Sequence, residues 1–227
     1  MNKKFLSHLN TLRGNGILIV SWGGIMNLWD ERFQHKRYAF GKEPNVFLTE
    51  AQNNHHIIEQ NDNALAIAEG EGRNAVYLAE LGANVTAWDF SIEGLRKAER
   101  LAFERGVHVE TEHVDLNEAQ WPINHWDQIV CIYGHFSPPL KSKTIAHVKK
   151  ALKPGGHFIS EVYSIYQLPY NSGGPKSEDM LYDPIQLLEA FHDWKIKHFY
   201  TGETIRNEGD YHHGLAHVIQ MFVQKPF

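Results

Sequence analysis

The residues best suited to chemistry stand in one short segment, Glu69-Gly-Glu-Gly-Arg-Asn74. This segment follows an apolar run that predicts a strand and opens a pattern that predicts a helix. Within it, Gly70 and Gly72 would let the backbone turn sharply and let a ligand approach the main chain closely. Because such turns between a strand and a helix commonly bind nucleotides, we interpret the segment as a cofactor loop.

The charges of this loop bear on which cofactor it would hold. With Ala75 the loop satisfies the loose dinucleotide fingerprint G-x-G-x-x-A, so an NAD-dependent oxidoreductase is one interpretation. Glu69 and Glu71, however, would place negative charge beside a helix N-terminus, where a dinucleotide sets its pyrophosphate. An acidic loop instead suits a cationic ligand such as S-adenosylmethionine, which carries a sulfonium and no phosphate. We therefore predict S-adenosylmethionine as the cofactor.

Two further carboxylates would extend this site. Asp89 ends the second predicted strand about 20 residues after the loop, a position from which a carboxylate can accept hydrogen bonds from ribose hydroxyls. Asp115 follows the third predicted strand and could bond an adenine amino group. The alternative for both residues is turn or cap chemistry within the chain.

A parallel sheet is needed to bring these side chains together. From Asn63 onward, short apolar runs alternate with amphipathic helical patterns, which is typical of successive βα units. The last helix would bury Ile185, Leu188 and Phe191, and the last two strands could pair antiparallel at one edge. Strands are predicted at 64–68, 83–88, 107–114, 128–133, 157–163, 195–201 and 215–223, and helices at 73–81, from Ser91 to Gly106, from Pro138 to before Pro154, and from Pro184.

Composition excludes several classes of protein. The chain has 227 residues, enough for one α/β domain with a full hydrophobic core. Its 22 basic and 27 acidic residues are scattered without a basic stripe, so we expect no nucleic-acid partner. The one cysteine, Cys131, cannot form an intrachain disulfide, which favours a reducing, cytoplasmic location. No apolar run is long enough to span a bilayer, and we expect no membrane partner.

Four segments occur in a recognisable order: Ala68-Glu-Gly-Glu-Gly-Arg-Asn74, Val85-Thr-Ala-Trp-Asp-Phe-Ser91, Trp126-Asp-Gln-Ile-Val130 and Leu152-Lys-Pro-Gly-Gly156. This order resembles the class I S-adenosylmethionine-dependent methyltransferases over most of residues 27–227. The chain looks closest to the small-molecule branch of tellurite-resistance and thiopurine methyltransferases, which also show segments like Trp29-Asp-Glu-Arg-Phe33 and Phe40-Gly-Lys-Glu-Pro-Asn45. The resemblance implies a Rossmann-like three-layer α/β sandwich with helices on both faces of a seven-stranded, mostly parallel sheet whose last strand is antiparallel.

The resemblance also implies a domain plan. We expect a methyltransferase domain at 26–227, in which residues 26–60 form an N-terminal lid over a Rossmann-like core at 61–227. Residues 1–25 fit no element of this plan, and their apolar run Gly16-Ile-Leu-Ile-Val20 lacks the length and cleavage site of a secretion signal. We expect these residues to be an extra leader from a misassigned start, with translation beginning at Met26.

The lid would fold over the cofactor, so that Tyr38 or Phe40 contacts the sulfonium through cation–π attraction. This chain has Arg73-Asn74 where the family often has another glycine, so Arg73 either points into the cleft, pairs with a carboxylate or is solvated. The predicted cofactor-binding residues are Glu69, Gly70, Glu71, Gly72, Arg73, Asn74, Asp89, Phe90, Ser91, Asp115, Leu116, Tyr133 and Tyr38.

Methyl transfer to a small molecule needs alignment in a dry pocket more than it needs a catalytic triad. His135, which follows the fourth predicted strand, is the candidate catalytic residue, with packing or hydrogen bonding as its alternative role. Glu161 and Tyr163 would end the fifth strand near the same edge. His213 and His217 would share a strand face, but no further ligand completes a metal set, so no metal is predicted.

The sequence thus predicts a methyltransferase acting on a small-molecule acceptor, such as a thiol or a chalcogen oxyanion like tellurite. Two alternatives stay open, an NAD-dependent oxidoreductase and a cofactor-binding module without turnover. One uninterrupted domain is compatible with a monomer or a weak homodimer.

Overall fold

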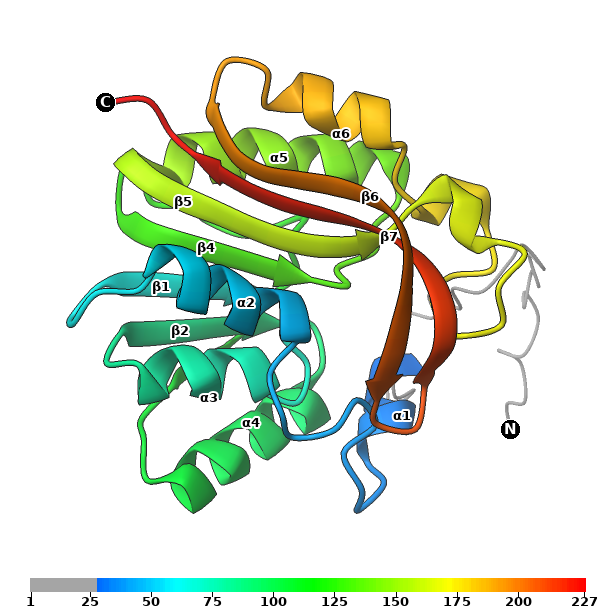
Figure 1. Ribbon diagram of the computed structural model, residues 1–227. Helices are drawn as coiled ribbons and strands as arrows, with labels where there is room; N and C mark the ends of the chain where they lie inside the picture. The colour runs from blue at the N-terminus through cyan, green and yellow to red at the C-terminus, as the bar shows by residue number, and fades with distance from the viewer. Residues whose placement is uncertain (1–27) are drawn as a thin grey trace, which may run out of the picture.

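The computed structural model describes residues 28–227 as helices layered on both faces of one sheet (Figure 1). The strand order is β3-β2-β1-β4-β5-β7-β6, and the neighbours are parallel except at β7, which is antiparallel to β5 and β6. This is the predicted fold class. The strands are β1 (Asn63–Ile67), β2 (Asn84–Asp89), β3 (Glu110–His113), β4 (Trp126–Ile132), β5 (Leu152–Tyr163), β6 (Lys195–Glu208) and β7 (His212–Gln224), and the α-helices are α1 (Leu28–Phe33), α2 (Val46–His55), α3 (Arg73–Glu80), α4 (Ile92–Arg105), α5 (Pro138–Ala151) and α6 (Pro184–Ala190).

The central strands are apolar throughout because both of their faces are covered. In β1, Ala64 and Ala66 face a cluster formed with α2, α3 and α4, whereas Leu65 and Ile67 face a second cluster formed with α5 and α6. Figure 1 shows these two sets of helices on either side of the sheet. This layering holds the carboxyl ends of the parallel strands at one edge, where ligands of open α/β sheets bind.

Local signals set the ends of α4 as the sequence predicted. The Ser91 side chain accepts a hydrogen bond from the Gly94 amide at 3.0 Å, which caps the first turn of the helix. At the other end, Gly106 adopts a left-handed conformation with φ of 72° and stops the helix. The start of α4 is therefore fixed directly after Asp89.

The predicted buried face of α6 is partly wrong. Pro184, Leu187 and Phe191 are buried, whereas Ile185 is 68% exposed. Both Pro184–Leu187–Phe191 and Ile185–Leu188–Phe191 follow helical spacing, and a helix of 7 residues is too short for periodicity to choose between two such rows.

The last hairpin is longer than predicted. Strand β5 pairs with β7 only at residues 218–224, whereas β6 pairs with β7 along its whole length, from Lys195 opposite Gln224 to Glu208 opposite His212. Residues 203–208 and 212–217 therefore form a two-stranded ribbon that extends past the sheet and bends over its carboxyl edge (Figure 1). The ribbon was missed because its polar residues do not give the apolar signal of a sheet strand.

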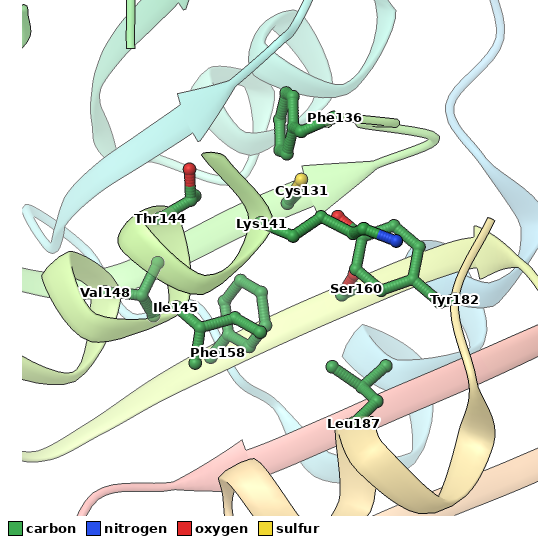
Figure 2. A pocket seen from close by; sticks show the side chains of 10 residues that line it. All are labelled: Cys131, Phe136, Lys141, Thr144, Ile145, Val148, Phe158, Ser160, Tyr182 and Leu187. Atoms are coloured by element: carbon green, nitrogen blue, oxygen red, sulfur yellow. The ribbon is translucent and has the colours of Figure 1, made fainter. Parts of the chain in front are cut away.

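A small cavity lies under α5, between that helix and strands β4 and β5 (Figure 2). Its volume is about 20 Å³, which is room for roughly one water molecule. Cys131, Thr144 and Ser160 line it together with apolar side chains, and the Thr144 hydroxyl has no protein partner. The cavity is far too small for a nucleoside, so it is not the expected cofactor site.

The expected leader at residues 1–25 and the expected start at Met26 lie outside the described residues. Within residues 28–227, none of the helices has the length and apolar character required to cross a membrane.

Candidate functional site

The glycine loop connects β1 to α3 and depends on glycine at two positions. Gly70 and Gly72 have φ of 62° and 91°, a region that other residues adopt only with strain. A Cβ on Gly72 would stand 2.5 Å from both Cα and Cβ of Ala98 on α4. Gly72 therefore allows the loop and α4 to pack directly against each other.

Glu69 closes the N-terminus of α3. Its Oε1 accepts hydrogen bonds from the amides of Asn74 and Ala75, both at 2.8 Å. A dinucleotide would place its pyrophosphate against these same amides. Because a carboxylate already holds them, the oxidoreductase alternative lacks its usual anion site.

Burial raises the pKa of Glu69 to about 7, although its two amide bonds favour the ionised form. Between the ordinary value of 4.5 and about 7, the folded state holds a proton that the unfolded chain has lost. The free energy of unfolding should therefore fall as pH rises through this window.

Glu69→Gln should reduce this slope, since the amide oxygen keeps an acceptor for the two helix amides and cannot titrate. Urea unfolding of both proteins at pH about 5 and about 8 measures the change. Some slope should survive, because burial also raises the pKa of Asp89, to about 6. An unchanged slope in the variant would show that Glu69 does not titrate in this window.

Glu71 binds the N-terminal segment through the main chain of residues 39 and 40. One oxygen accepts hydrogen bonds from the Ala39 and Phe40 amides at 2.7 and 3.3 Å, and the other lies 2.6 Å from the Lys97 ammonium. The glutamate and the lysine are both buried. The charge of Glu71 is therefore neutralised internally, and the acidic character of the loop comes from Glu69.

Asp89 joins the loop to the end of β2. Its two oxygens accept hydrogen bonds from the amides of Gly70 and Ser91, each at 2.7 Å. Phe90, half exposed, and Ser91 follow directly, so the structure brings the predicted residues of 69–74 and 89–91 together at one edge.

Asp115 follows β3, with buried Leu116 beside it. Its side chain accepts hydrogen bonds from the amide and side chain of Asn117 at 2.8 and 3.0 Å. This is the turn chemistry considered as its alternative role.

Arg73 and Asn74 connect the loop to distant segments. The Arg73 guanidinium pairs with Glu208 at 2.9 Å and donates to the Phe40 carbonyl oxygen at 3.2 Å. The Asn74 side-chain oxygen accepts from the Asn45 amide at 2.9 Å. Of the roles considered for Arg73, the structure shows pairing with a carboxylate.

A buried network occupies the carboxyl ends of β4 and β5. The Glu161 carboxylate accepts hydrogen bonds from Asn45 at 2.9 Å, Tyr133 at 2.5 Å and Gln220 at 2.7 Å, and it pairs with Arg206. Tyr133 has a left-handed backbone with φ of 54° at the end of β4. Ala68 has φ of 52° at the end of neighbouring β1, so two adjacent strands end in strained residues at this edge.

His135 has structural partners that the sequence could not show. Its Nδ1 lies 3.0 Å from the Met180 carbonyl oxygen, and its Nε2 accepts a hydrogen bond from the Tyr163 amide at 3.3 Å. Burial lowers the pKa of His135 to about 3. Because both ring nitrogens hold the backbone, the structure favours the hydrogen-bonding role over the catalytic one.

Tyr38 also has partners other than a cofactor. Its hydroxyl donates to the Lys97 carbonyl oxygen at 3.1 Å, and the ammonium groups of Lys42 and Lys97 lie 4.8 and 5.1 Å from its ring. The ring thus contacts two lysine ammonium groups, and the hydroxyl bonds the main chain of α4. These contacts do not support the predicted contact with the sulfonium.

Several residues at this edge were not predicted as site residues from the sequence: Asn45, Lys97, Arg206, Glu208 and His212. All are buried polar residues whose partners lie far away in the chain. A polar residue in a ribbon or on an amphipathic helix gives no local sign of such burial. Among residues 28–227, no group of three or more His, Cys, Asp or Glu side chains is arranged to hold a metal ion.

The chain is similar to known methyltransferases. Residues 64–156 match a methyltransferase domain family. Over 105 residues the chain is 29% identical to demethylmenaquinone methyltransferase from Clavibacter sepedonicus, and the match covers 46% of this chain and 42% of that enzyme. The chain thus spans less than half the length of this relative.

Solved structures share the fold. One is an S-adenosylmethionine-dependent methyltransferase from Methanosarcina mazei, with a TM-score of 0.60, 19% identity and coverage of 77% of this chain and 97% of that one. Another is TehB from Haemophilus influenzae, with a TM-score of 0.63, 16% identity and coverage of 87% and 65%. The family match extends from β1 through the glycine loop and Asp89 into β5. Residues 64–156 thus match a methyltransferase domain family, and the chain shares its fold with S-adenosylmethionine-dependent methyltransferases.

Proposed function

We propose that this protein transfers a methyl group from S-adenosylmethionine to a small-molecule acceptor, a thiol or a chalcogen oxyanion such as tellurite. The observation that carries the proposal is the Glu69 carboxyl group on the first turn of α3, which occupies the anion site of a dinucleotide and leaves a buried acidic group at the glycine turn. Bound S-adenosylmethionine supplies an electrophilic methyl group on a positively charged sulfur.

The residues at the edge fit this ligand. Gly70 and Gly72 let the main chain approach it, and Asp89 has lone pairs beyond its two amide bonds for ribose hydroxyl donors. Phe90, half exposed beside Asp89, offers an apolar face to a base. Buried side chains at the ends of β4 and β5 exclude water from the acceptor side, and alignment there supplies much of the acceleration.

Asp89→Asn should weaken S-adenosylmethionine binding by about 10- to 100-fold, since hydrogen bonds to a charged group contribute about 1.5–3 kcal/mol. Isothermal calorimetry measures the affinity, and thermal unfolding checks that the variant folds. Asp115→Asn is the matched control: asparagine can keep the turn with Asn117, so its affinity should stay within about 3-fold of the wild type. Equal losses in both variants would contradict the assigned role of Asp89.

The function itself is tested by incubating the wild-type protein with S-adenosylmethionine and thiols, selenite or tellurite, and by measuring S-adenosylhomocysteine. Tight binding without any product would favour the binding module without turnover, and affinity for NAD alone would favour the oxidoreductase. A cytoplasmic location and a monomeric or weakly dimeric state belong to this proposal, and ultracentrifugation tests the latter.

A further inference from the structure

Four aromatic rings meet beside the glycine loop, at the carboxyl ends of β4 and β5. The Tyr163 ring stacks on that of Tyr133 with centroids 4.7 Å apart. The His212 ring, at the start of β7, lies 4.4 Å from Tyr133, 5.6 Å from Tyr163 and 4.6 Å from Phe40 of the N-terminal segment. The cluster thus joins the sheet edge, the ribbon and the segment that covers them.

The Tyr163 hydroxyl lacks a hydrogen-bond partner, on a side chain that is 0% exposed, and Nδ1 of His212, on a side chain that is 5% exposed, has only a long contact with Glu208. A buried polar atom without a partner costs about 1–3 kcal/mol, so such atoms are rare and mark places where a ligand can complete the bonding.

Both side chains border the same position on the loop after β5. A Cβ added to Gly173 would stand 2.9 Å from the Tyr163 hydroxyl oxygen and 2.9 Å from Cδ2 of His212. Gly173 has φ of 131°, which also requires glycine. The backbone of Gly173 therefore packs directly against the phenol and the imidazole edge, and a side chain there would clash with both.

A carboxylate orients the imidazole. Nδ1 of His212 lies 3.5 Å from Glu208, which also pairs with Arg73 at 2.9 Å and accepts a hydrogen bond from the Asn45 side chain at 3.2 Å. Burial lowers the pKa of His212 while Glu208 opposes the shift, so the ring is neutral near pH 7 and able to accept a proton. The charged and titratable groups that face it are Glu208 on β6, Arg73 on α3, Glu161 and Tyr163 on β5, and Tyr133 and His135 after β4.

The charges of the edge indicate what kind of acceptor fits. The buried cations among residues 28–227 are Arg73, Lys97 and Arg206, and each is already paired with a buried glutamate. An oxyanion would find no unpaired buried cation here. A neutral acceptor with a thiol or hydroxyl group would instead meet a hydrogen-bonding phenol and a neutral imidazole.

We propose that Tyr163 and His212 form the acceptor site for a neutral thiol or hydroxyl compound, with Tyr163 binding the acceptor and His212 taking its proton. This inference rests on the proposed function. The acceptor lone pair forms the bond to the methyl carbon, the carbon–sulfur bond breaks, and its electron pair stays on sulfur to give neutral S-adenosylhomocysteine. The acceptor proton moves to Nε2 of His212, because Nδ1 faces Glu208, and Glu208 stabilises the imidazolium that results.

His212→Asn tests the proton transfer, with mercaptoethanol and nitro-substituted thiophenol as acceptors. Mercaptoethanol is mostly protonated at neutral pH and needs a base, whereas the nitrothiophenol is already a thiolate. The variant should lose about 100-fold or more in kcat with mercaptoethanol and about 3-fold or less with the thiophenol. The exposed neighbour His213 supplies the control, since His213→Asn should match the wild type with both acceptors.

Tyr163→Phe tests acceptor binding separately. Its hydroxyl has no partner, so the variant should unfold at the same temperature as the wild type or higher, while KM for mercaptoethanol rises about 5-fold or more at nearly constant kcat. Equal losses of kcat with both thiols in His212→Asn would show that His212 has a structural role, and would overturn its role as the base. Turnover of selenite or tellurite without any neutral thiol or hydroxyl acceptor would overturn the acceptor class. Failure of the wild type to bind S-adenosylmethionine would instead reject the proposed function.

Discussion

Glu161→Ala should lower the free energy of unfolding by about 3–5 kcal/mol, the range for breaking a buried ion pair by removing one partner. The Arg206 guanidinium would stay buried without its carboxylate, and Asn45, Tyr133 and Gln220 would lose the oxygens to which they donate. Urea unfolding followed by circular dichroism measures the loss, with the slope checked for two-state behaviour.

An exposed ion pair gives the matched control. Asp193 pairs with Lys149 at 2.5 Å, but its side chain is 51% exposed, so Asp193→Ala should cost about 1 kcal/mol or less. The double variant Glu161→Leu with Arg206→Met removes both charges and should recover part of the loss. A cost for Glu161→Ala no larger than that for Asp193→Ala would show that water reaches the Glu161 network.

This network also marks the limit of what the sequence could reveal about the site. The glycine loop, Asp89 and the Ser91 cap were predictable because their signals are local: a strand, two glycines and a capping residue within a few positions. Glu161 instead bonds Arg206 and Asn45, which lie 45 and 116 positions away in the chain. Nothing in a single sequence pairs one glutamate with one distant arginine before the topology is known.

The sequence predicted an acidic loop but not that one of its two glutamates is paired with a lysine. Both glutamates lie beside the start of α3 as predicted, but Lys97 neutralises Glu71 and the N-terminal segment covers it. Lys97 lies between buried Gly94 and Leu101 on one face of α4, but lysine is seldom fully buried, so its burial could not be predicted from its residue type. The preference for a cationic ligand therefore depends on Glu69, and on Asp89 beyond it.

His135 and His212 show the same limit at the acceptor side. His135 lies three residues after the end of β4, which made it the natural candidate, yet its nitrogens contact the Met180 and Tyr163 backbone. His212 stands in a polar stretch that predicted a loop, and only the length of the β6–β7 ribbon brings it over the sheet edge. The position of a residue at the end of a strand can be predicted from the sequence. The position of a residue on an extended hairpin cannot, because it depends on how far the hairpin reaches.

Gly72→Ala should cost about 2–5 kcal/mol in the free energy of unfolding. A left-handed backbone costs a residue with a Cβ about 1–2 kcal/mol, and overpacking adds about 1–3 kcal/mol. The new Cβ would stand 2.5 Å from Cα and Cβ of Ala98, so the loop or α4 must shift. Because Gly70, two residues before Gly72, is hydrogen-bonded to Asp89, a shift of the loop would move both residues, and S-adenosylmethionine affinity should fall at least about 10-fold as well.

Gly106 separates the two causes of this loss. It also has a left-handed backbone, with φ of 72°, but a Cβ there would meet nothing within 4 Å. Gly106→Ala should therefore cost only the backbone strain, about 1–2 kcal/mol, and leave S-adenosylmethionine affinity unchanged. Chemical denaturation of both variants measures the free energy of unfolding, and calorimetry measures the affinity for S-adenosylmethionine. Equal costs with equal affinities would mean that the loop tolerates a methyl group against α4, and that close packing at Gly72 does not shape the cofactor site.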